Sequence, residues 1–308
     1  MQEVVTRSLR RRSLRLGALA VVGLGLGLGL GCGRDEAKPV PATAPAVAPV
    51  PAAPPPRLVS LTPSATEVVA ALGATAMLVG VDDYSAYPAE VTRLPKVGSF
   101  LAPNLEIIVG LKPTLVIVDD VHGQAAGALN DAGITTVACA IHALPDVKAA
   151  LRAVGARIGK TAEADHAIEG IDAALDRAAA HRPGRRPRVL AVIDREAGGL
   201  GNLVTAGPGS WLDELLAVVG ADNVLRGAGV RYPKISAEEV LRAKPDVILD
   251  LSYAARQSVA PWQTLAVPAV TEHRVRALAD AFLIAPSPRV AEALATLATA
   301  IDLTRSGD

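Results

Sequence analysis

Asn104-Leu-Glu-Ile-Ile-Val-Gly-Leu-Lys-Pro-Thr-Leu-Val-Ile-Val118 returns in a second version as Ser236-Ala-Glu-Glu-Val-Leu-Arg-Ala-Lys-Pro-Asp-Val-Ile-Leu-Asp250. Each copy starts with a residue that favours a helix N-cap, has a carboxylate two positions later, and ends in Lys-Pro before an apolar run. We therefore expect each copy to form a short helix that stops at the proline and leads into a buried strand. The two carboxylates, Glu106 and Glu238, are separated by 132 residues (238 minus 106).

A second pair of similar segments supports two related halves. Glu67-Val-Val-Ala-Ala-Leu-Gly-Ala74 matches Glu214-Leu-Leu-Ala-Val-Val-Gly-Ala221. In both halves predicted strands alternate with predicted helices, a pattern typical of parallel sheets covered on both faces. The stretch from Thr161 to His181 is Ala-rich and predicts a helix about 30 Å long. The sequence thus predicts an α/β fold in which two parallel-sheet lobes are joined by one long helix, with a ligand cleft between them.

We divide the chain accordingly. The predicted segments are an export signal (1–32), a Pro/Ala-rich tether (33–56), an N-terminal lobe (57–160), a connecting helix (161–182) and a C-terminal lobe (183–308). The tether has eight prolines between Pro39 and Pro56, and at about 3.1 Å per residue this stretch spans roughly 55 Å.

The N-terminus is typical of an exported protein. Five arginines up to Arg15 precede an apolar, Gly-rich run, and the run ends at Leu30-Gly-Cys32. Cys32 is therefore a predicted lipid-attachment site that ties the protein to a membrane on its extracytoplasmic side. The alternative is an ordinary cleaved signal with an incidental cysteine. The pair Arg11-Arg12 fits twin-arginine export, and the general route stays open. Cys139 is expected to be a small buried strand residue.

Composition excludes some functions. The chain has 31 basic and 31 acidic residues, a balance that gives no long-range attraction for nucleic acid. The sequence has no Gly-x-Ser-x-Gly, Walker or His-Glu-x-x-His motif, so we expect neither an enzyme nor a resident cofactor. His122 and His142 follow neighbouring strands, but the second half adds only His273 beyond the repeat. We therefore expect no metal site.

Aromatic residues make up only 3% of the chain, so their positions are informative. Most fall in loops that follow predicted strands, where ligands of parallel α/β folds bind. Flat rings with a polar tip suit a large ligand with two faces and polar edges. Asp119, Arg289 and Tyr253 are further candidates, and for each residue the alternative is an ordinary surface loop position. The residues that we select for ligand contact are Tyr84, Tyr87, Phe100, Asp120, His122, Arg195, Tyr232, Asp280 and Phe282.

Several motifs together resemble one family. In the first half these are Leu58–Glu67, Val79–Tyr84, Tyr87-Pro88, Leu94–Gly98 and the repeat helix, and in the second half Gly207–Ser210, Gly220–Asn223, Tyr232–Ser236 and Pro288-Arg289. In this order they resemble the vitamin B12 and ferric-siderophore binding proteins of ABC importers, from Arg57 to the C-terminus. The resemblance implies the helical-backbone fold, with the Thr161–His181 helix as its backbone.

The resemblance also implies partners. Glu106 and Glu238 correspond to carboxylates that pair with arginines on the two transmembrane subunits of the permease. The alternative is that each only interacts with the dipole of its helix. The expected ligand is cobalamin, followed by a ferric siderophore and then by haem or a bare metal ion. We expect a monomer, and a surface sensor without a permease is the alternative outside this class.

Overall fold

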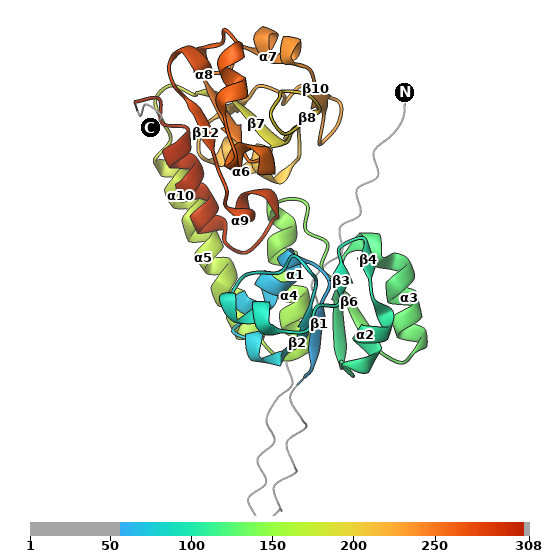
Figure 1. Cartoon of the computed structure of the whole chain (residues 1–308). Coiled ribbons are helices and arrows are strands. Elements are labelled where there is room, and N and C mark those ends of the chain that lie inside the picture. Colours follow the sequence, from blue (N-terminus) through green and yellow to red (C-terminus); the bar gives the residue numbers. More distant parts are fainter. Residues whose placement is uncertain (1–55, 305–308) are drawn as a thin grey trace, which may run out of the picture. The chain divides into compact units, whose positions relative to one another are not determined.

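The computed structural model describes residues 56–304 of the chain. Within this range two α/β lobes follow one another along the sequence, and a long helix lies along both (Figure 1). The predicted export signal with Cys32, and the tether up to residue 55, lie outside the described residues. No helix in the described range has both the length and the apolar composition needed to cross a membrane.

The first lobe has a four-stranded sheet in which all strands run parallel, in the order β2-β1-β5-β6. A small hairpin of two-residue strands precedes α2. The elements of this lobe are β1 (Leu58–Ser60), α1 (Pro63–Ala71), β2 (Leu78–Val81), β3 (Gly98–Ser99), β4 (Ala102–Pro103), α2 (Leu105–Gly110), β5 (Leu115–Val118), α3 (Gly123–Asp131), β6 (Thr135–Ala138) and α4 (Leu144–Ile158). Short 3-10 turns lie at Thr75–Met77, Ala89–Arg93 and Asp120–His122.

The second lobe has a six-stranded sheet with the order β10-β8-β7-β11-β12, and β9 also pairs with β7. Two 3-10 turns, Tyr253–Arg256 and Ala260–Thr264, follow β11. The elements are β7 (Arg188–Asp194), β8 (Leu203–Thr205), α6 (Trp211–Val218), β9 (Asp222–Asn223), β10 (Lys234–Ile235), α7 (Ala237–Ala243), β11 (Val247–Asp250), α8 (Pro268–Thr271), β12 (Val275–Ala277), α9 (Ala281–Ile284) and α10 (Val290–Ala300).

The second sheet corrects the expectation of two purely parallel sheets. Strand β8 runs antiparallel to β7, and β10 runs antiparallel to β8. The link from β7 to β8 contains no helix, and a parallel partner would require a crossover of a dozen or more residues. The chain therefore turns straight back on itself at this edge, and the sheet is mixed. Strands β7, β11 and β12 keep the parallel arrangement.

The repeat has the expected local structure in both copies. The side chain of Asn104 accepts a hydrogen bond from the Ile107 amide (3.1 Å), and Ser236 accepts one from the Glu239 amide (3.4 Å). After each helix the lysine before the proline takes a left-handed backbone conformation, with φ 49° at Lys112 and 45° at Lys244. This conformation ends the helix, and the proline then starts the path into the buried strand.

Successive side chains along a strand point to opposite faces of its sheet, so the buried side chains form separate clusters on the two faces. Leu58 and Val189 lie in one large cluster of buried side chains, whereas their neighbours Val59 and Leu190 lie in smaller clusters on the opposite faces of their sheets. The large cluster takes in α1, α4, α5 (Thr161–Ala180), α6 and α10, so it is continuous across both lobes. The lobes are therefore joined by packed apolar side chains as well as by α5, which contacts α4 and α10.

Candidate functional site

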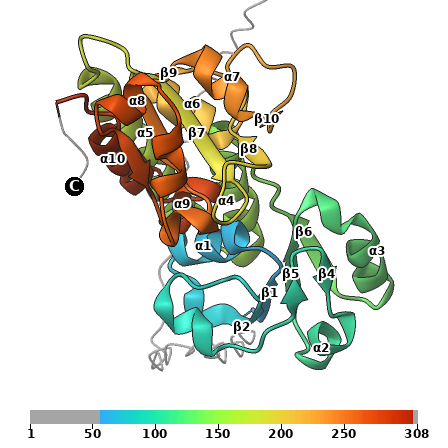
Figure 2. The same cartoon turned by 45° about the horizontal axis from the view of Figure 1, so that its top comes forward.

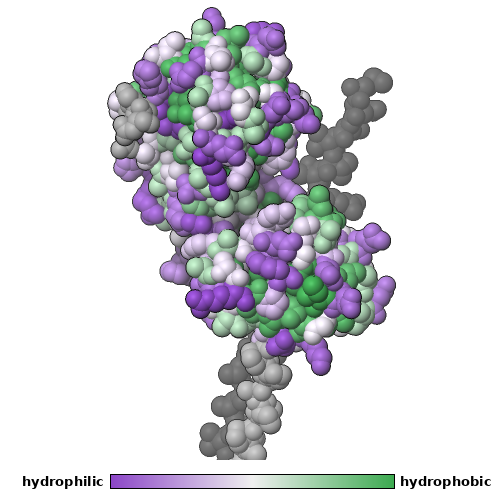
Figure 3. Space-filling model, in the orientation of Figure 1, coloured by the Kyte–Doolittle hydropathy of each residue, from purple (hydrophilic) through white to green (hydrophobic). Residues whose placement is uncertain are grey.

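Tyr87 and Phe282, two of the predicted ligand residues, lie where the two lobes meet. The loop with Tyr87 follows β2, and α9 follows β12, so the two belong to different lobes. Figure 2 shows α9 directly next to α1, and Figure 1 agrees. The surface is hollowed between the upper and lower lobes in Figure 3. The residues around this junction are the candidate site.

Arg289 connects the lobes at this junction. Its guanidinium lies 4.0 Å from the ring centroid of Tyr87 in the first lobe and 4.3 Å from that of Phe282 in the second. Glu292, one turn along α10, accepts from the Arg289 Nε (2.9 Å) and keeps the side chain extended toward the rings. The structure thus brings Tyr87 and Phe282 together through a cation, with Tyr87 44% exposed and Phe282 buried.

The second pair of similar segments places two glutamates across the same junction. Glu214 in α6 accepts a hydrogen bond from the Leu144 amide of the first lobe (2.6 Å). Glu67 in α1 lies close enough to Ser287 and Arg289 of the second lobe for both residues to lower its pKa. Each glutamate therefore reaches from its own lobe into the other. We define these two residues as the inward glutamates.

Glu67 is the less well satisfied of the two. It is 6% exposed, and its Oε2 is a buried oxygen with no hydrogen-bond partner among the described residues. Burial raises the pKa of Glu67, and Ser287 and the charge of Arg289 only partly oppose this. Burial therefore makes this carboxyl easier to protonate than an exposed glutamate.

His122 is placed differently from what the sequence predicts. It is 3% exposed, its Nδ1 accepts from the Asp119 amide (2.9 Å), and its Nε2 donates to the Phe100 carbonyl oxygen (2.7 Å). The rings of His122 and Phe100 also meet edge to face at 5.5 Å. Both ring nitrogens are used inside the protein, which contradicts a direct ligand contact. The capping position after β5 turns His122 inward, while Phe100 stays half-buried.

Two carboxyl groups and a second histidine meet beside this turn. One carboxylate oxygen each of Asp119 and Asp120 and a ring nitrogen of His142 lie within 4.8 Å of one another. The distance from His142 Nε2 to Asp120 Oδ2 is 3.1 Å. Burial, followed by the hydrogen bond and charge of Asp120, raises the pKa of Asp119 to about 6. The same hydrogen bond, with that of His142, lowers the pKa of Asp120 to about 2. This exposed edge can accept a hydrogen-bond donor from a ligand.

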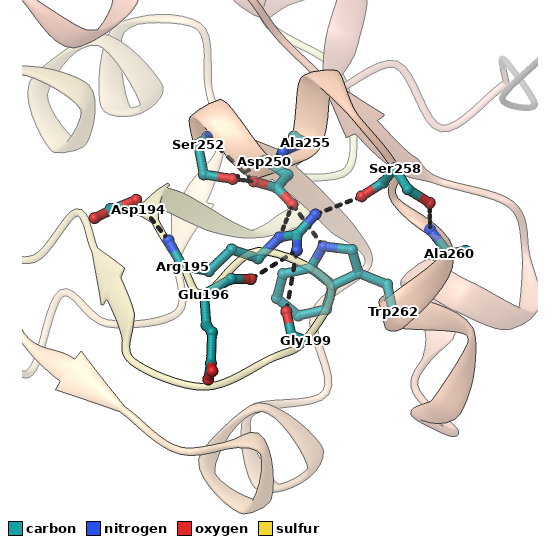
Figure 4. A network of polar contacts seen from close by, with 10 residues as sticks. All are labelled: Asp194, Arg195, Glu196, Gly199, Asp250, Ser252, Ala255, Ser258, Ala260 and Trp262. Carbon is teal, nitrogen blue, oxygen red and sulfur yellow. Dashed lines mark hydrogen bonds and ion pairs between the residues drawn. The ribbon is translucent and has the colours of Figure 1, made fainter.

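Arg195 contradicts its predicted role as a free charge in the cleft. Its side chain is fully buried and forms an ion pair with Asp250, with 2.7 Å between Nε and Oδ2 (Figure 4). Asp250 also accepts from Trp262 Nε1 (2.7 Å) and Ser252 Oγ (2.6 Å). The parallel pairing of β7 with β11 places the ends of both strands side by side, so the arginine after one meets the aspartate that ends the other.

The remaining predicted ligand residues are exposed. Tyr84 is 67% exposed, Tyr232 47% and Tyr253 72%, and Asp280 is also at the surface. The exposure of their polar tips leaves them accessible to a bulky partner. Within residues 56–304 no contact joins these side chains to the group around Arg289, so their role in ligand binding stays a prediction.

Glu106 and Glu238 both lie in the first turn of a helix and are exposed. Glu106 has no ion pair or side-chain hydrogen bond within the described range. A hydrogen bond with Ser236 lowers the pKa of Glu238. We define these two residues as the outward glutamates.

Residues 58–280 match the family model described as "Periplasmic binding protein". This span covers most of the folded part of the chain. The chain belongs to the periplasmic binding protein family. Its membership places the folded part of this protein outside the cytoplasm.

Individual members of the periplasmic binding protein family are similar to this chain over most of their length. The chain is 29% identical to the vitamin B12-binding protein of Pectobacterium carotovorum, over 70% of this chain and 80% of that protein. It is 26% identical to the uncharacterized ABC transporter substrate-binding lipoprotein YvrC of Bacillus subtilis, over 80% of each. The fold is similar to that of the apo periplasmic heme-binding protein RhuT from Roseiflexus sp. RS-1 (TM-score 0.73, 28% identity), covering 82% of this chain and all of that one.

Sequence reasoning about this periplasmic binding protein missed the inward glutamates and the partners of Arg195. Glu67 and Glu214 stand at matching positions of the second pair of similar segments, so the repeat itself was a usable signal. The partnership of Arg195 with Asp250 and Trp262 had no such signal, because these residues are 55 and 67 positions apart and share no motif.

Proposed function

We propose that this protein is the substrate receptor of an ABC importer, and that it captures cobalamin between its lobes and hands it to the permease. The observation that carries the proposal is the likeness to a vitamin B12-binding protein over 80% of that protein's length. In this reading the chain binds and releases its cargo unchanged and catalyses no reaction.

The chemistry of the junction suits a corrinoid. Tyr84, Tyr87 and Tyr232 offer flat rings with phenolic tips, which pack against an extended macrocycle and donate hydrogen bonds to amide edges. The Arg289 guanidinium, between Tyr87 and Phe282, presents donors in a fixed plane. Asp120 is exposed and ionised over the whole neutral range, so it can accept hydrogen bonds from amide side chains of the ligand.

Haem is the second candidate, because the structure is similar to an apo heme-binding protein with a TM-score of 0.73. The carboxylates of haem would pair with Arg289, and a tyrosine phenolate is a known type of iron ligand. Tyr84 and Tyr87 are exposed tyrosines of the loop that follows β2 in the first lobe. A ferric siderophore would use the same arginine and rings.

The ligand is tested by titrating the folded part, residue 57 onward, with cyanocobalamin, haemin and a panel of ferric siderophores. Calorimetry reports binding of each compound, and absorbance reports a change in the iron or cobalt coordination. Saturable binding of cyanocobalamin with no signal from haemin supports the first candidate. Haemin binding with a phenolate-type absorbance spectrum would instead favour haem over cobalamin as the ligand. That spectrum should then be lost in Tyr84→Phe or Tyr87→Phe. No binding of any compound would favour a surface sensor.

The membrane connection is part of the same proposal. Cys32 would carry the lipid, and the Pro/Ala-rich segment after it would hold the lobes away from the membrane surface. A relative named as a lipoprotein supports this. Metabolic palmitate labelling should mark the wild-type protein and leave Cys32→Ala unlabelled. Equal labelling of both would contradict the anchor without affecting the ligand proposal.

The outward glutamates would dock the receptor on the two transmembrane subunits, one glutamate on each. They stand at matching positions of a repeat, they are exposed, and each follows the capping residue of its helix by two positions. A permease with two related subunits would meet such a surface with a pair of basic residues. Docking through charge requires little movement within the receptor, and the apolar core shared by the lobes favours small movements.

A further inference from the structure

The two outward glutamates occupy the same position of the repeat but stand in different surroundings. Next to Glu106, the first helix has Leu105 and Ile107, whereas the second has Ala237 and Glu239 at the matching positions. Ile107 is 41% exposed, while Glu239 is folded back onto the Ser236 amide (2.7 Å). The two helices thus present the same charge beside an apolar surface in one lobe and a polar surface in the other.

A groove opens at the start of α2. It has a volume of about 330 Å³ and is lined by residues of the β3–β4 hairpin, α2, the Asp120–His122 turn and α3. Most are apolar, among them Leu101, Leu105, Val121 and Ala128, and His122 and Gln124 are the polar members. Leu101 is 81% exposed and Val121 55%, values that are large for such side chains. Apolar surface is visible on the lower lobe in Figure 3, in the region where Figure 1 places β4 and α2.

The second lobe has its own hollow at the start of α7, with a volume of about 490 Å³. Its lining is mostly polar and includes Asn202, Lys234 and both Glu238 and Glu239. One wall is the chain from Leu200 to Asn202, which ends a loop that Arg195 holds through the Gly199 carbonyl oxygen (3.0 Å). The buried side chain of Arg195 therefore holds one wall of this hollow. Among the lining residues, the apolar side chains of Leu200, Ile235 and Ala237 are outnumbered by polar ones.

We propose that the groove beside Glu106 receives a large apolar side chain of the permease that lies next to the basic residue pairing with Glu106. This inference rests on the proposed docking of the outward glutamates, because the groove reaches α2 at Leu105, the residue before Glu106. An apolar groove next to an unpaired carboxylate fits a segment in which a large apolar residue adjoins Arg or Lys. The first lobe then docks by apolar burial and charge together, and the second lobe by charge.

Because the two docking sites differ in chemistry, their contacts with the permease should respond differently to salt. Apolar contacts are not screened by salt, whereas the contacts of an exposed charge weaken as ionic strength rises. High salt should therefore loosen the second lobe from the permease more than the first.

The test uses the full-length receptor, with and without cyanocobalamin, and nanodiscs that contain its permease. Ala128→Phe fills the groove from an exposed position of α3, and Ala132→Phe adds the same ring at an exposed position outside the groove. We expect Ala128→Phe to weaken receptor–permease binding by roughly tenfold or more, at low and at high salt, because one buried apolar side chain is lost. Ala132→Phe should bind like the wild type.

A second measurement separates this inference from the docking proposal. Photoreactive residues in place of Leu101 and Asn202 report the two sites independently. Crosslinks to permease subunits from both positions, with the one at 202 lost first as salt rises, support the inference. Crosslinking from 202 alone, together with wild-type binding by Ala128→Phe, would overturn the groove and leave the docking of the outward glutamates standing. A wild-type receptor that binds no permease would overturn both.

Discussion

The outward and inward glutamates are two pairs of the same residue type, each pair placed by a repeat, yet they lie in opposite environments. Glu106 and Glu238 are exposed at helix starts. Glu67 is buried beside Ser287 and Arg289 of the other lobe, and the half-buried Glu214 accepts a hydrogen bond across the junction. An exposed carboxylate costs nothing to keep charged and is available to a partner, whereas a buried one must be hydrogen-bonded or neutral. The comparison teaches that repeated carboxylates can serve recognition or cohesion, depending on burial.

The largest expected effect comes from reversing the outward pair. We expect the double variant Glu106→Arg and Glu238→Arg to abolish uptake of the cargo, because both docking charges would repel the permease. Calorimetric affinity for the ligand and the melting temperature should stay unchanged. Uptake assays in cells and calorimetry on the purified protein check this, with Glu90→Arg as an exposed control. A drop in ligand affinity would contradict the assignment of the outward glutamates to docking alone.

A third type of carboxylate extends the comparison to full burial. Asp250 is 0% exposed and has a complete set of partners. Asp250→Ala should lower the free energy of unfolding by about 3–5 kcal/mol, because it leaves the buried Arg195 charge unpaired. Urea unfolding measures this, with Asp280→Ala as a surface control within about 0.5 kcal/mol of wild type. A loss below about 1 kcal/mol would mean that water reaches Arg195.

Removal of one inward contact should have an intermediate effect. Glu214→Ala deletes the hydrogen bond to the Leu144 amide, and we expect a loss of about 1.5 kcal/mol, typical of a bond to a charged acceptor. Hydrogen exchange should speed up in the first turn of α4 and leave β5 unchanged. If hydrogen exchange instead became faster throughout both lobes, the contact would stabilise the whole folded protein, and the expectation of a local effect would be wrong.

The smallest effect concerns pH. Because burial raises the pKa of Glu67 in the folded state, the folded protein binds a proton there that the unfolded chain has released. The contribution to stability is thus complete below the ordinary value of 4.5 and is lost as pH rises through the raised pKa. Glu67→Gln should flatten the decline of stability over this interval, as followed by thermal melting at several pH values. An unchanged pH profile would show that Glu67 is charged in the fold.

The sequence predicted the first lobe better than the second. Caps at Asn104 and Ser236, the strands after both Lys-Pro pairs, and the long helix from Thr161 are local features, and the structure has them. The reversal at β8 was missed because its strand has only three residues, too few for a pattern. The burial of His122 and Arg195 was missed because a charged or polar residue after a strand gives no sign of which way it turns.

Thus the amino-acid order by itself determined the repeated helices and the strands that follow them, that they come in two related sets, and where their carboxylates stand along each helix. These properties depend on neighbouring residues, whose spacing and capping chemistry are written along the chain. The tertiary structure alone decided which of those carboxylates meet solvent, which meet the other lobe, and which arginine is buried against Asp250. Such outcomes depend on residues that are distant in the chain and become neighbours only when the two lobes pack into one shared apolar core.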